Sequence, residues 1–511
     1  MTDWTAGYVA DIGYTYGYYT ELNPLRVRLA FLNAGIVPPE VGTACELGFG
    51  QGMSANLHAA ASVVHWAGTD FNPSQAGFAQ ELATVSGAGA KLYDDAFADF
   101  ANRPDLPDFD FIGLHGIWSW INDENRKYII DFIRKKLRVG GVLYISYNTL
   151  PGWAAFAPLR KLMSQHAQVM SSPGEGIVNR IDEAVDFAEK LFSTNPNYMK
   201  ANSLVAERLK KLRGQNRQYL AHEYFNKDWH PMYFSDVATE MAKAKLQFAC
   251  SAHYLDHIDA LNLNVDQQDF LKQIADPIFT ESVRDFMVNQ QFRRDYWIKG
   301  RRQLSPIEQT ELLRDHRIVL ISHRPDISLK VKGALGEAEM SSSVYGPILD
   351  VIADHKVHTL GEIEKILASK EINLGKLLQA IFVLSGAGHV ASVQEDSAIS
   401  KAKKTTDRLN AVLVSDARFR KETVYLSSPV TGGGMALGRF QQLFLLARMN
   451  GKKTPEEWAA ATWQFVMAQG QKLVKEGRSL ETAEDNLAEL TDQARTFAQK
   501  QLPILKALQV A

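Results

Sequence analysis

The sequence predicts an α/β fold in which an open, mainly parallel sheet is followed by mainly α-helical domains. Two observations predict it. Five apolar runs alternate with helical patterns between residues 43 and 146, and most of the chain beyond repeats its apolar residues at helical spacing. Because 511 residues exceed what one core supports, the length predicts two to four domains. The pattern along the chain divides it into four, covering residues 1–155, 156–305, 306–395 and 396–511.

The first apolar run ends in a glycine-rich turn. Residues 43–52 place a predicted buried strand before the pattern E-x-G-x-G-x-G, and residues 53–60 continue as a predicted helix. Gly48 permits a tight reversal, Gly50 leaves room for a ligand at the backbone, and Gly52 lets the helix pack near the strand. The turn therefore predicts a site for a nucleotide-like cofactor.

The second predicted strand, residues 63–70, ends in Asp70, where a carboxylate can bind both hydroxyls of a ribose. The glycine spacing differs from the G-x-G-x-x-G of dinucleotide sites, whose helix N-terminus faces a pyrophosphate. Glu46 would repel a pyrophosphate, but it suits a cofactor with a cationic amino-acid end. A dinucleotide cofactor is the less favoured alternative.

Three further predicted strands follow in the order of such a sheet. Residues 90–93 precede Asp94 and Asp95, residues 109–114 precede His115, and residues 142–146 follow a helix at 124–137 and a glycine turn at 140–141. In an open α/β sheet, ligands lie beyond the carboxyl ends of the strands. The loop that begins at His115 should therefore border the reaction centre.

This set of strands, acids and glycines resembles the class I S-adenosylmethionine-dependent methyltransferases, which have a Rossmann-like sheet. The resemblance implies S-adenosyl-L-methionine as the cofactor of residues 1–155, with an acid after the third strand on the adenine amino group and an apolar residue against the ring. The implied cofactor-binding residues are Glu46, Gly48, Phe49, Gly50, Gln51, Gly52, Asp70, Phe71, Asn72, Asp94, Asp95, Ala96, Phe97, His115 and Gly116.

Segments outside these motifs narrow the resemblance. The tyrosine-rich residues 14–24, residues 146–153 and residues 219–237 are similar to bacterial methyltransferases with a methyltransferase regulatory domain, a group that includes lysine methyltransferases of outer-membrane proteins. This resemblance implies a protein-lysine N-methyltransferase with a protein substrate and places a helical regulatory domain at 156–305. Appended domains of this size also favour a macromolecular acceptor.

Aromatic residues are the candidates for an acceptor slot. A lysine must lose its proton to attack a methyl group, and an apolar aromatic slot favours the neutral amine by desolvation. Candidates to line such a slot are Tyr14 and Tyr19 of the tyrosine run and the later residues Trp120 and Trp153. The residues expected to act in catalysis are Tyr16, Tyr18, Trp118 and Tyr147. The alternative is that these aromatics serve core and lid packing.

Two other functions stay open on the sequence. One is O- or N-methylation of a small metabolite or a polysaccharide precursor, and the other is a regulatory protein that binds the cofactor without turnover. The chain lacks an Asn/Asp-Pro-Pro-Tyr/Phe motif after the fourth strand, which disfavours nucleobases and glutamine amides as acceptors.

Composition limits the partners. A net charge of −2 gives no general field for nucleic acid, and no apolar run approaches the roughly 18 residues of a membrane span. We expect a cytoplasmic protein, with a homodimer as an option. Cys45 and Cys250 are expected in the core rather than in a disulfide or a metal site. His222 is not expected to bind a metal, because no second histidine follows it four residues later.

The helical remainder divides as follows. Helices are expected at 153–169 and 177–192, separated by a break at 171–176, and an amphipathic pattern covers 270–297. Helices at 345–355, 359–367 and 373–384 resemble a winged-helix module, for which a structural or docking role is expected. Residues 393–407 are predicted to be a linker and residues 431–434 a mobile loop within a helical C-terminal domain.

Overall fold

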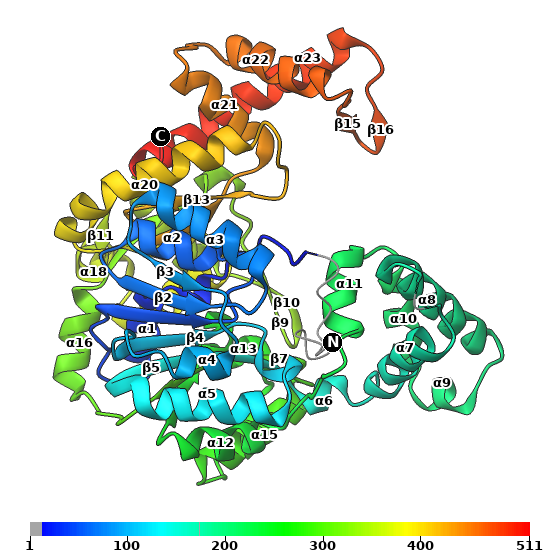
Figure 1. Ribbon diagram of the computed structural model, residues 1–511. Coiled ribbons are helices and arrows are strands. Elements are labelled where there is room, and N and C mark those ends of the chain that lie inside the picture. The colour runs from blue at the N-terminus through cyan, green and yellow to red at the C-terminus, as the bar shows by residue number, and fades with distance from the viewer. Residues whose placement is uncertain (1–12, 173) are drawn as a thin grey trace.

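The computed structural model describes residues 13–172 and 174–511. The beginning of the first expected domain, residues 1–12, and Pro173 in the expected helix break lie outside the described residues. A seven-stranded sheet in the order β3-β2-β1-β4-β5-β7-β6 forms the centre (Figure 1). Its strands are β1 Thr43–Leu47, β2 His65–Thr69, β3 Lys91–Tyr93, β4 Phe109–Leu114, β5 Leu137–Asn148, β6 Gln247–Ser251 and β7 Phe292–Ile298.

The first five strands run parallel, which confirms the predicted α/β class and all five predicted strands. In their register, Cys45 of β1 lies opposite Ala67 of β2 and Ile112 of β4. The last two strands are antiparallel: β7 pairs with β5, and β6 pairs with β7. Both come from the interval 156–305, where a helical domain was expected, and the last part of the amphipathic pattern expected over 270–297 is the strand β7 rather than a helix.

Helices cover both faces of the sheet (Figure 1). Residues alternate along each strand, so that Ala44 and Phe111 pack on one face while Cys45 and Ile112 pack on the other. The first face meets α1 Pro24–Asn33, α2 Met53–Ala61 and α3 Pro73–Ser86, and the second meets α4 Phe97–Ala101, α5 Asp123–Lys136 and α12 Phe234–Lys243. Both cysteines are buried and free, as predicted.

A helical lobe follows β5 and projects to one side of the sheet (Figure 1). It has its own core, to which Trp153, Ile181 and Leu220 belong. The expected helix at 153–169 is divided at residues 154–156, while the next helix begins at Ile177 as predicted. The lobe comprises α6 Leu150–Trp153, α7 Ala157–Val169, α8 Ile177–Ser193, α9 Asn197–Ala201, α10 Ser203–Leu212 and α11 Arg217–Tyr224.

Between the lobe and the middle region, short helices accompany β6 and β7: α13 Asp259–Asn262, α14 Val265–Leu271 and α15 Pro277–Met287. The middle region joins helices to a three-stranded antiparallel sheet in the order β11-β8-β12. Its elements are α16 Pro306–Arg314, β8 Arg317–Leu320, β9 Lys330–Gly333, β10 Gly336–Glu339, α17 Ser342–Val351, β11 His358–Thr359, α18 Leu360–Ile366, α19 Leu374–Gly386 and β12 Val390–Ser392. Its winged-helix character stays a prediction.

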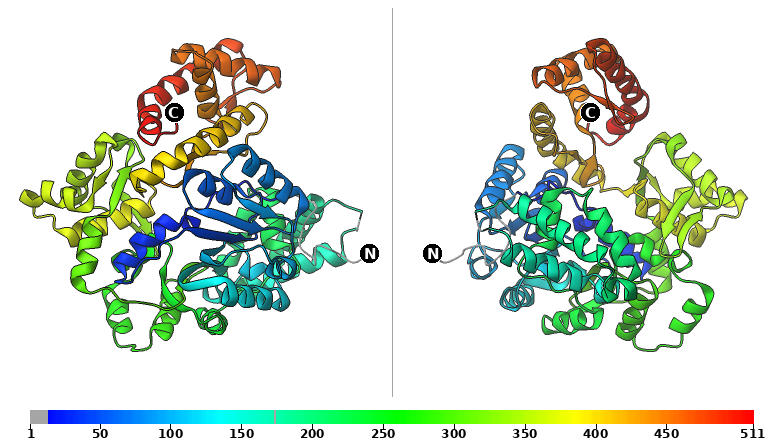
Figure 2. Two further views of the ribbon diagram at one scale, coloured as in Figure 1. Left: turned by 60° about the vertical axis from the view of Figure 1, so that its left-hand side comes forward. Right: turned by 90° about the vertical axis from the view of Figure 1, so that its right-hand side faces the viewer.

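The C-terminal region lies over α2 and α3 and ends in helices far from the lobe of α7–α10 (Figures 1 and 2). It comprises α20 Asp396–Asp416, β13 Tyr425–Ser428, β14 Gly433–Ala436, α21 Arg439–Met449, α22 Pro455–Ala468, β15 Val474–Lys475, β16 Arg478–Ser479, α23 Ala483–Thr496 and α24 Leu502–Ala507. Within the described residues, no helix is long and apolar enough to span a membrane.

Two expectations for this region are wrong. Most of the predicted linker at 393–407 is the first half of α20, because Ile399, Ala402 and Thr406 form a buried stripe at helical spacing. The predicted mobile loop at 431–434 is packed against the first domain, where Asn23 donates to the carbonyl of Thr431 at 3.0 Å. The C-terminal region also packs against α2, the helix that begins at the glycine turn.

Candidate functional site

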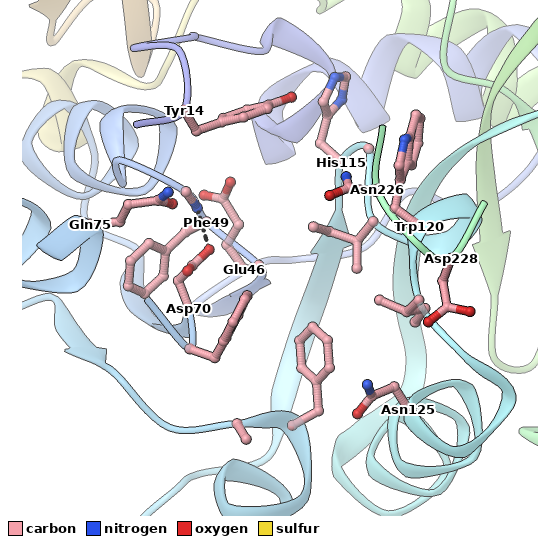
Figure 3. Close-up of a pocket in the computed structure, with 18 of the residues that line it drawn as sticks. Tyr14, Glu46, Phe49, Asp70, Gln75, His115, Trp120, Asn125, Asn226 and Asp228 are labelled. Atoms are coloured by element: carbon pink, nitrogen blue, oxygen red, sulfur yellow. Dashed lines mark hydrogen bonds between the residues drawn. The ribbon is translucent and has the colours of Figure 1, made fainter. Parts of the chain in front are cut away.

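A pocket opens beyond the carboxyl ends of the parallel strands, where the sequence predicts a ligand (Figure 3). Its wall combines the glycine turn, the residues after β2, β3 and β4, the tyrosine segment and a segment after α11. The lining residues are Tyr14, Tyr19, Glu46, Gly48, Phe49, Gly50, Asp70, Phe71, Gln75, Asp95, Ala96, Phe97, His115, Gly116, Ile117, Trp120, Ile121, Asn122, Asn125, Asn226 and Asp228.

All three glycines of the turn have positive φ, so replacing any of them strains the backbone. Gly48 has φ +71°, and a Cβ there would also collide with the adjacent side chain of Ile117. Gly52 has φ +66°, and a Cβ there would collide with Ala79 of α3. The close approach that Gly52 allows is therefore between α2 and α3, rather than the predicted one between α2 and the strand.

Asp70 is fixed at the end of β2 by backbone donors. Its Oδ2 accepts from Gly50 N at 2.8 Å, drawn in Figure 3, and its Oδ1 accepts from Asn72 N at 3.1 Å. Asn72 in turn caps α3 through Ser74 N at 3.0 Å. Burial raises the pKa of Asp70 to about 6, although both backbone donors oppose the shift. A ligand hydroxyl would therefore meet an oriented carboxyl group.

Glu46 lies buried beside Asp70, on the same side of the pocket as Phe49 and Gln75 (Figure 3). Burial raises its pKa to about 8, and the charge of Asp70 adds to the shift. Its Oε2 has no hydrogen-bond partner among the described residues. A buried carboxyl oxygen without a partner costs free energy that a donor on a ligand would recover. Glu46 thus fits a cationic amino group.

The third acid is anchored differently. Asp95 accepts from Arg103 Nη1 at 3.0 Å through Oδ2, and its backbone carbonyl accepts from the hydroxyl of Thr69. Asp94 is exposed and does not line the pocket, whereas Phe97 of α4 does. Of the two expected acids, only Asp95 is therefore placed to meet a ligand.

His115, directly after β4, carries an uncharged ring. Burial lowers its pKa to about 4, although the charge of Glu21 opposes the shift. Its Nδ1 lies 2.7 Å from the hydroxyl of Tyr144 on β5, and its ring stacks on Tyr19 with 3.5 Å between centroids. The imidazole is therefore a fixed, neutral part of the wall.

The opposite wall comes from the chain after α11. Asn226 is anchored by hydrogen bonds: its Nδ2 donates to His222 O at 2.6 Å, and its backbone carbonyl accepts from Arg160 Nη2 at 3.1 Å. The ring of His222 meets that of Tyr14 edge-on, 5.0 Å between centroids. Tyr14, His115 and Asn226 lie toward one end of the pocket, and Asn125 lies at the other (Figure 3).

The structure brings most of the predicted cofactor residues together in this wall. Those that line it are Glu46, Gly48, Phe49, Gly50, Asp70, Phe71, Asp95, Ala96, Phe97, His115 and Gly116. Gln51, Gly52, Asn72 and Asp94 do not line it. The first of these donates its Nε2 to the Tyr14 carbonyl at 3.4 Å, and so it supports the wall from behind.

None of the four predicted catalytic residues lines the pocket. Tyr16 packs edge-on against Phe78 of α3, and Tyr18 packs against His58 of α2 and Tyr425 of β13. Both belong to the core that joins the C-terminal region to α2 and α3. The side chains of the tyrosine run therefore point in two directions. Tyr14 and Tyr19 line the pocket, whereas Tyr16 and Tyr18 point into the core beside α2 and α3.

The other two predicted catalytic residues are fully buried on the sheet face covered by α5 and α12. Trp118 precedes the pocket residue Trp120, and Tyr147 donates to Asp295 Oδ2 at 2.7 Å. Side chains alternate along a strand, so Tyr147 must point away from the face that Tyr144 shares with His115.

Several lining residues were missed. They are Gln75 on the first turn of α3, Ile117, Ile121, Asn122 and Asn125 around the start of α5, and Asn226 and Asp228 after α11. A weak signal existed for Asn226 and Asp228, since both lie within residues 219–237, which carry the narrower resemblance. No local pattern brings that segment to the pocket, because it follows the last of the five predicted strands by a long helical stretch.

Comparisons with known proteins identify the family of the chain. The family model described as a predicted methyltransferase regulatory domain matches residues 216–299, within the interval where that domain was expected. The uncharacterised protein sll1526 of Synechocystis is 41% identical over 513 residues, which cover 99% of this chain and 100% of that protein. The uncharacterised protein RP789 of Rickettsia prowazekii is 28% identical over 54% of this chain and 49% of its own length.

Solved structures show the same fold. PKMT2 from Rickettsia typhi in complex with AdoHcy superimposes with a TM-score of 0.69 at 18% identity, covering 97% of this chain and 99% of that chain. A second structure of PKMT2 gives a TM-score of 0.67. Together with the regulatory-domain match and the full-length relative, this fold places the chain in the family of class I S-adenosylmethionine-dependent methyltransferases that carry a methyltransferase regulatory domain.

Proposed function

We propose that the protein transfers a methyl group from S-adenosyl-L-methionine to the Nε atom of a lysine in a protein substrate. One observation carries the proposal. The described pocket lining contains the carboxyl groups of Glu46, Asp70, Asp95 and Asp228, several aromatic rings and no lysine or arginine. Such a wall favours a positively charged cofactor and an amine acceptor over an anionic ligand.

The cofactor would be held along the glycine turn. Glu46 would receive its amino group, Asp70 the two ribose hydroxyls and Asp95 the adenine amino group, with Phe71 and Phe97 beside the ring. The backbone around Gly48 to Gly50 would approach it closely, because no Cβ intervenes. Bound there, S-adenosylmethionine supplies a methyl group on a sulfonium, which an amine nitrogen can take by in-line displacement.

The acceptor amine would enter at the end of the pocket where Tyr14 and His115 lie. Tyr19 and Trp120 also line the pocket, and this apolar surround favours the neutral amine that must attack. His115 carries no positive charge at neutral pH, so it does not repel a lysine or the methylated product. These rings also attract a methylated ammonium.

One wall of the pocket comes from the regulatory domain, and this supports a protein acceptor. Asn226 and Asp228 belong to the segment matched by the regulatory-domain model, so a domain outside the cofactor module shapes the place where an acceptor would bind. The resemblance to lysine methyltransferases of outer-membrane proteins points the same way. The option of a homodimer stays open, and the expected cytoplasmic location stays a prediction.

Labelled methyl transfer into a cell extract tests the proposal. The full chain is incubated with S-adenosylmethionine carrying a radioactive methyl group, the extract is separated by size, and the labelled polymer is hydrolysed in acid. The expected product is methyl-lysine, in an amount that falls with Asp70→Ala. Label confined to small molecules would support the metabolite alternative, and the absence of any label would support the non-catalytic one.

A further inference from the structure

A second surface feature lies between α12 and α15. It is a groove, here called the aromatic groove, in which Tyr233, Phe279 and Phe286 are 42%, 58% and 64% exposed. The rings of Tyr233 and Phe286 stack with 6.2 Å between centroids and 11° between planes. Figure 1 shows the two helices side by side below the sheet. Three exposed aromatics in one groove are more than packing requires.

The groove has an acidic floor. Asp285 lines it and is only 3% exposed, and its Oδ1 accepts from Arg293 Nη1 at 2.6 Å. Its Oδ2 has no hydrogen-bond partner among the described residues. The same guanidinium also pairs with Asp295 and Glu281, so one cation serves three carboxyl groups. The Oδ2 atom of Asp285 is therefore a buried acceptor without a donor in the lining of the aromatic groove.

The chemistry of the groove selects its occupant. Asp276 lines it as well, and the described lining includes no lysine or arginine. Within the part of the chain that the structure describes, no cluster of His, Cys, Asp or Glu is arranged to hold a metal ion. Aromatic faces combined with carboxylates bind ammonium and guanidinium groups. The groove is thus complementary to a basic side chain.

The backbone ties the groove to the first pocket. Asp228 lines the pocket and Tyr233 lines the groove, so a stretch of five residues joins them and spans at most about 18 Å. This stretch is held against the sheet, because His230 N donates to Ser119 O at 2.7 Å and Met232 N donates to Asn148 O at 3.0 Å. The two sites therefore keep a fixed separation.

We propose that the aromatic groove binds a second lysine or arginine of the polypeptide substrate, about five to seven residues from the lysine held in the first pocket. Five fully extended residues span about 18 Å, and six or seven residues cover the same distance in a less extended chain. This inference rests on the proposed function and adds to it a preference for substrates in which basic residues recur at short intervals. The groove contributes affinity and register, and it takes no part in the chemical step.

Direct binding of defined peptides tests this inference without requiring turnover. Two fluorescent twelve-residue peptides of glycine and serine are compared by anisotropy on the full chain. One carries lysines at positions 3 and 9, and the other carries lysine at 3 and norleucine at 9. The two-lysine peptide is expected to bind about tenfold more tightly. Equal affinities would overturn the inference.

Variants assign that difference to the groove. Phe279→Ala combined with Phe286→Ala changes exposed side chains, so folding should persist, and the tenfold preference should fall to within about twofold. Phe419→Ala, at a 72% exposed phenylalanine elsewhere, serves as the matched control and should keep the preference. A preference that survives in the double variant would contradict the assignment. Asp285→Asn removes the carboxylate of the groove and should also lower the preference for the two-lysine peptide. Thermal unfolding of this variant controls for its folding.

Other outcomes remain separable. If the preference holds but neither peptide is methylated, the groove stands and the proposed function fails. If position 3 is methylated but both peptides bind equally, the proposed function stands and the groove inference fails. Light scattering of the wild type and of the double variant tests a third case: a dimer that only the wild type forms would show that a second copy of the chain covers the groove.

Discussion

The ring of Tyr19 lies on the imidazole of His115, with 3.5 Å between centroids and 19° between planes. The backbone N of Tyr19 also donates to Ser54 Oγ at 3.0 Å, on the first turn of α2. One residue thus connects the helix after the glycine turn to the loop after β4. In the proposed reaction, this connection places the acceptor end of the pocket relative to the cofactor end.

Removing this stacked ring should slow methyl transfer more than it weakens cofactor binding. Tyr19→Ala deletes the ring that covers His115, and an aromatic pair is worth about 1 kcal/mol, so kcat should fall on the order of tenfold. Tyr19→Phe keeps the stack and should retain most activity. Steady-state kinetics with calorimetric cofactor titration separates the two effects, and an equal loss of rate and cofactor affinity in Tyr19→Ala would contradict this role.

The other tyrosines of the run give the opposite expectation. Tyr16 and Tyr18 pack away from the pocket, so Tyr16→Ala and Tyr18→Ala should lower the melting temperature and leave the rate of the remaining folded protein within about twofold. Thermal unfolding and kinetics on the same preparations measure this. A large drop in kcat at an unchanged melting temperature would restore these tyrosines to the catalytic role predicted from sequence.

The raised pKa values of Glu46 and Asp70 predict a pH-dependent affinity. A cationic amino group binds the ionised form of Glu46, so cofactor binding should release protons and become tighter as the pH rises from about 6 toward 8. Glu46→Gln should remove the upper part of this dependence. Calorimetry in two buffers of different ionisation enthalpy counts the protons, and unchanged proton release in Glu46→Gln would contradict the assignment.

The same two groups affect the stability of the cofactor-free protein. Their pKa values are higher in the folded than in the unfolded state, so their contribution to the free energy of unfolding is complete below about pH 4. It is lost as the pH rises through about 6 for Asp70 and about 8 for Glu46. The melting temperature of Glu46→Gln should therefore fall less than that of the wild type between pH 6 and 8.

The contact between the C-terminal region and the first domain offers a stability test. A Cβ on Gly433 would collide with the Tyr18 hydroxyl and lie 2.9 Å from Asn23 Nδ2. Gly433→Ala should therefore destabilise the protein by about 1–3 kcal/mol. Gly346→Ala, within α17 and with no atom near the added Cβ, should be neutral or stabilising by up to about 1 kcal/mol. Thermal unfolding compares them, and equal melting temperatures would contradict the packing described.

The sequence predicted the parts of the fold that local pattern determines. The five parallel strands are apolar runs, and the glycine turn carries its own signal, so both could be placed. The strand β7 was missed because Arg293 and Asp295 interrupt its apolar residues. These side chains are paired where they are buried, since Arg293 donates to both Asp295 and Asp285, and no local pattern in the sequence records the contact with Asp285.

For the site, motif residues were predictable and the side-chain directions were not. Glu46 and Asp70 lie on strand ends whose position follows from the topology. Tyr16 and Tyr18 were assigned to the acceptor slot because they adjoin Tyr14 and Tyr19 in the chain. Tyr18 instead packs against the hairpin β13–β14, more than 400 residues away, where its ring meets that of Tyr425. Tyr16 packs against Phe78 of α3.

The most direct test of the account is the affinity of S-adenosylmethionine for the full chain and for a variant of Asp70. If this carboxylate binds the ribose, Asp70→Ala should weaken binding by about 1–3 kcal/mol, and Asp70→Asn, which keeps an acceptor oxygen, by less. Glu81→Ala, at an exposed acid on α3, is the control and should bind as the wild type does. Calorimetry on preparations with matched melting temperatures decides the matter: the predicted loss supports the cofactor pocket, and unchanged affinity in Asp70→Ala would contradict it.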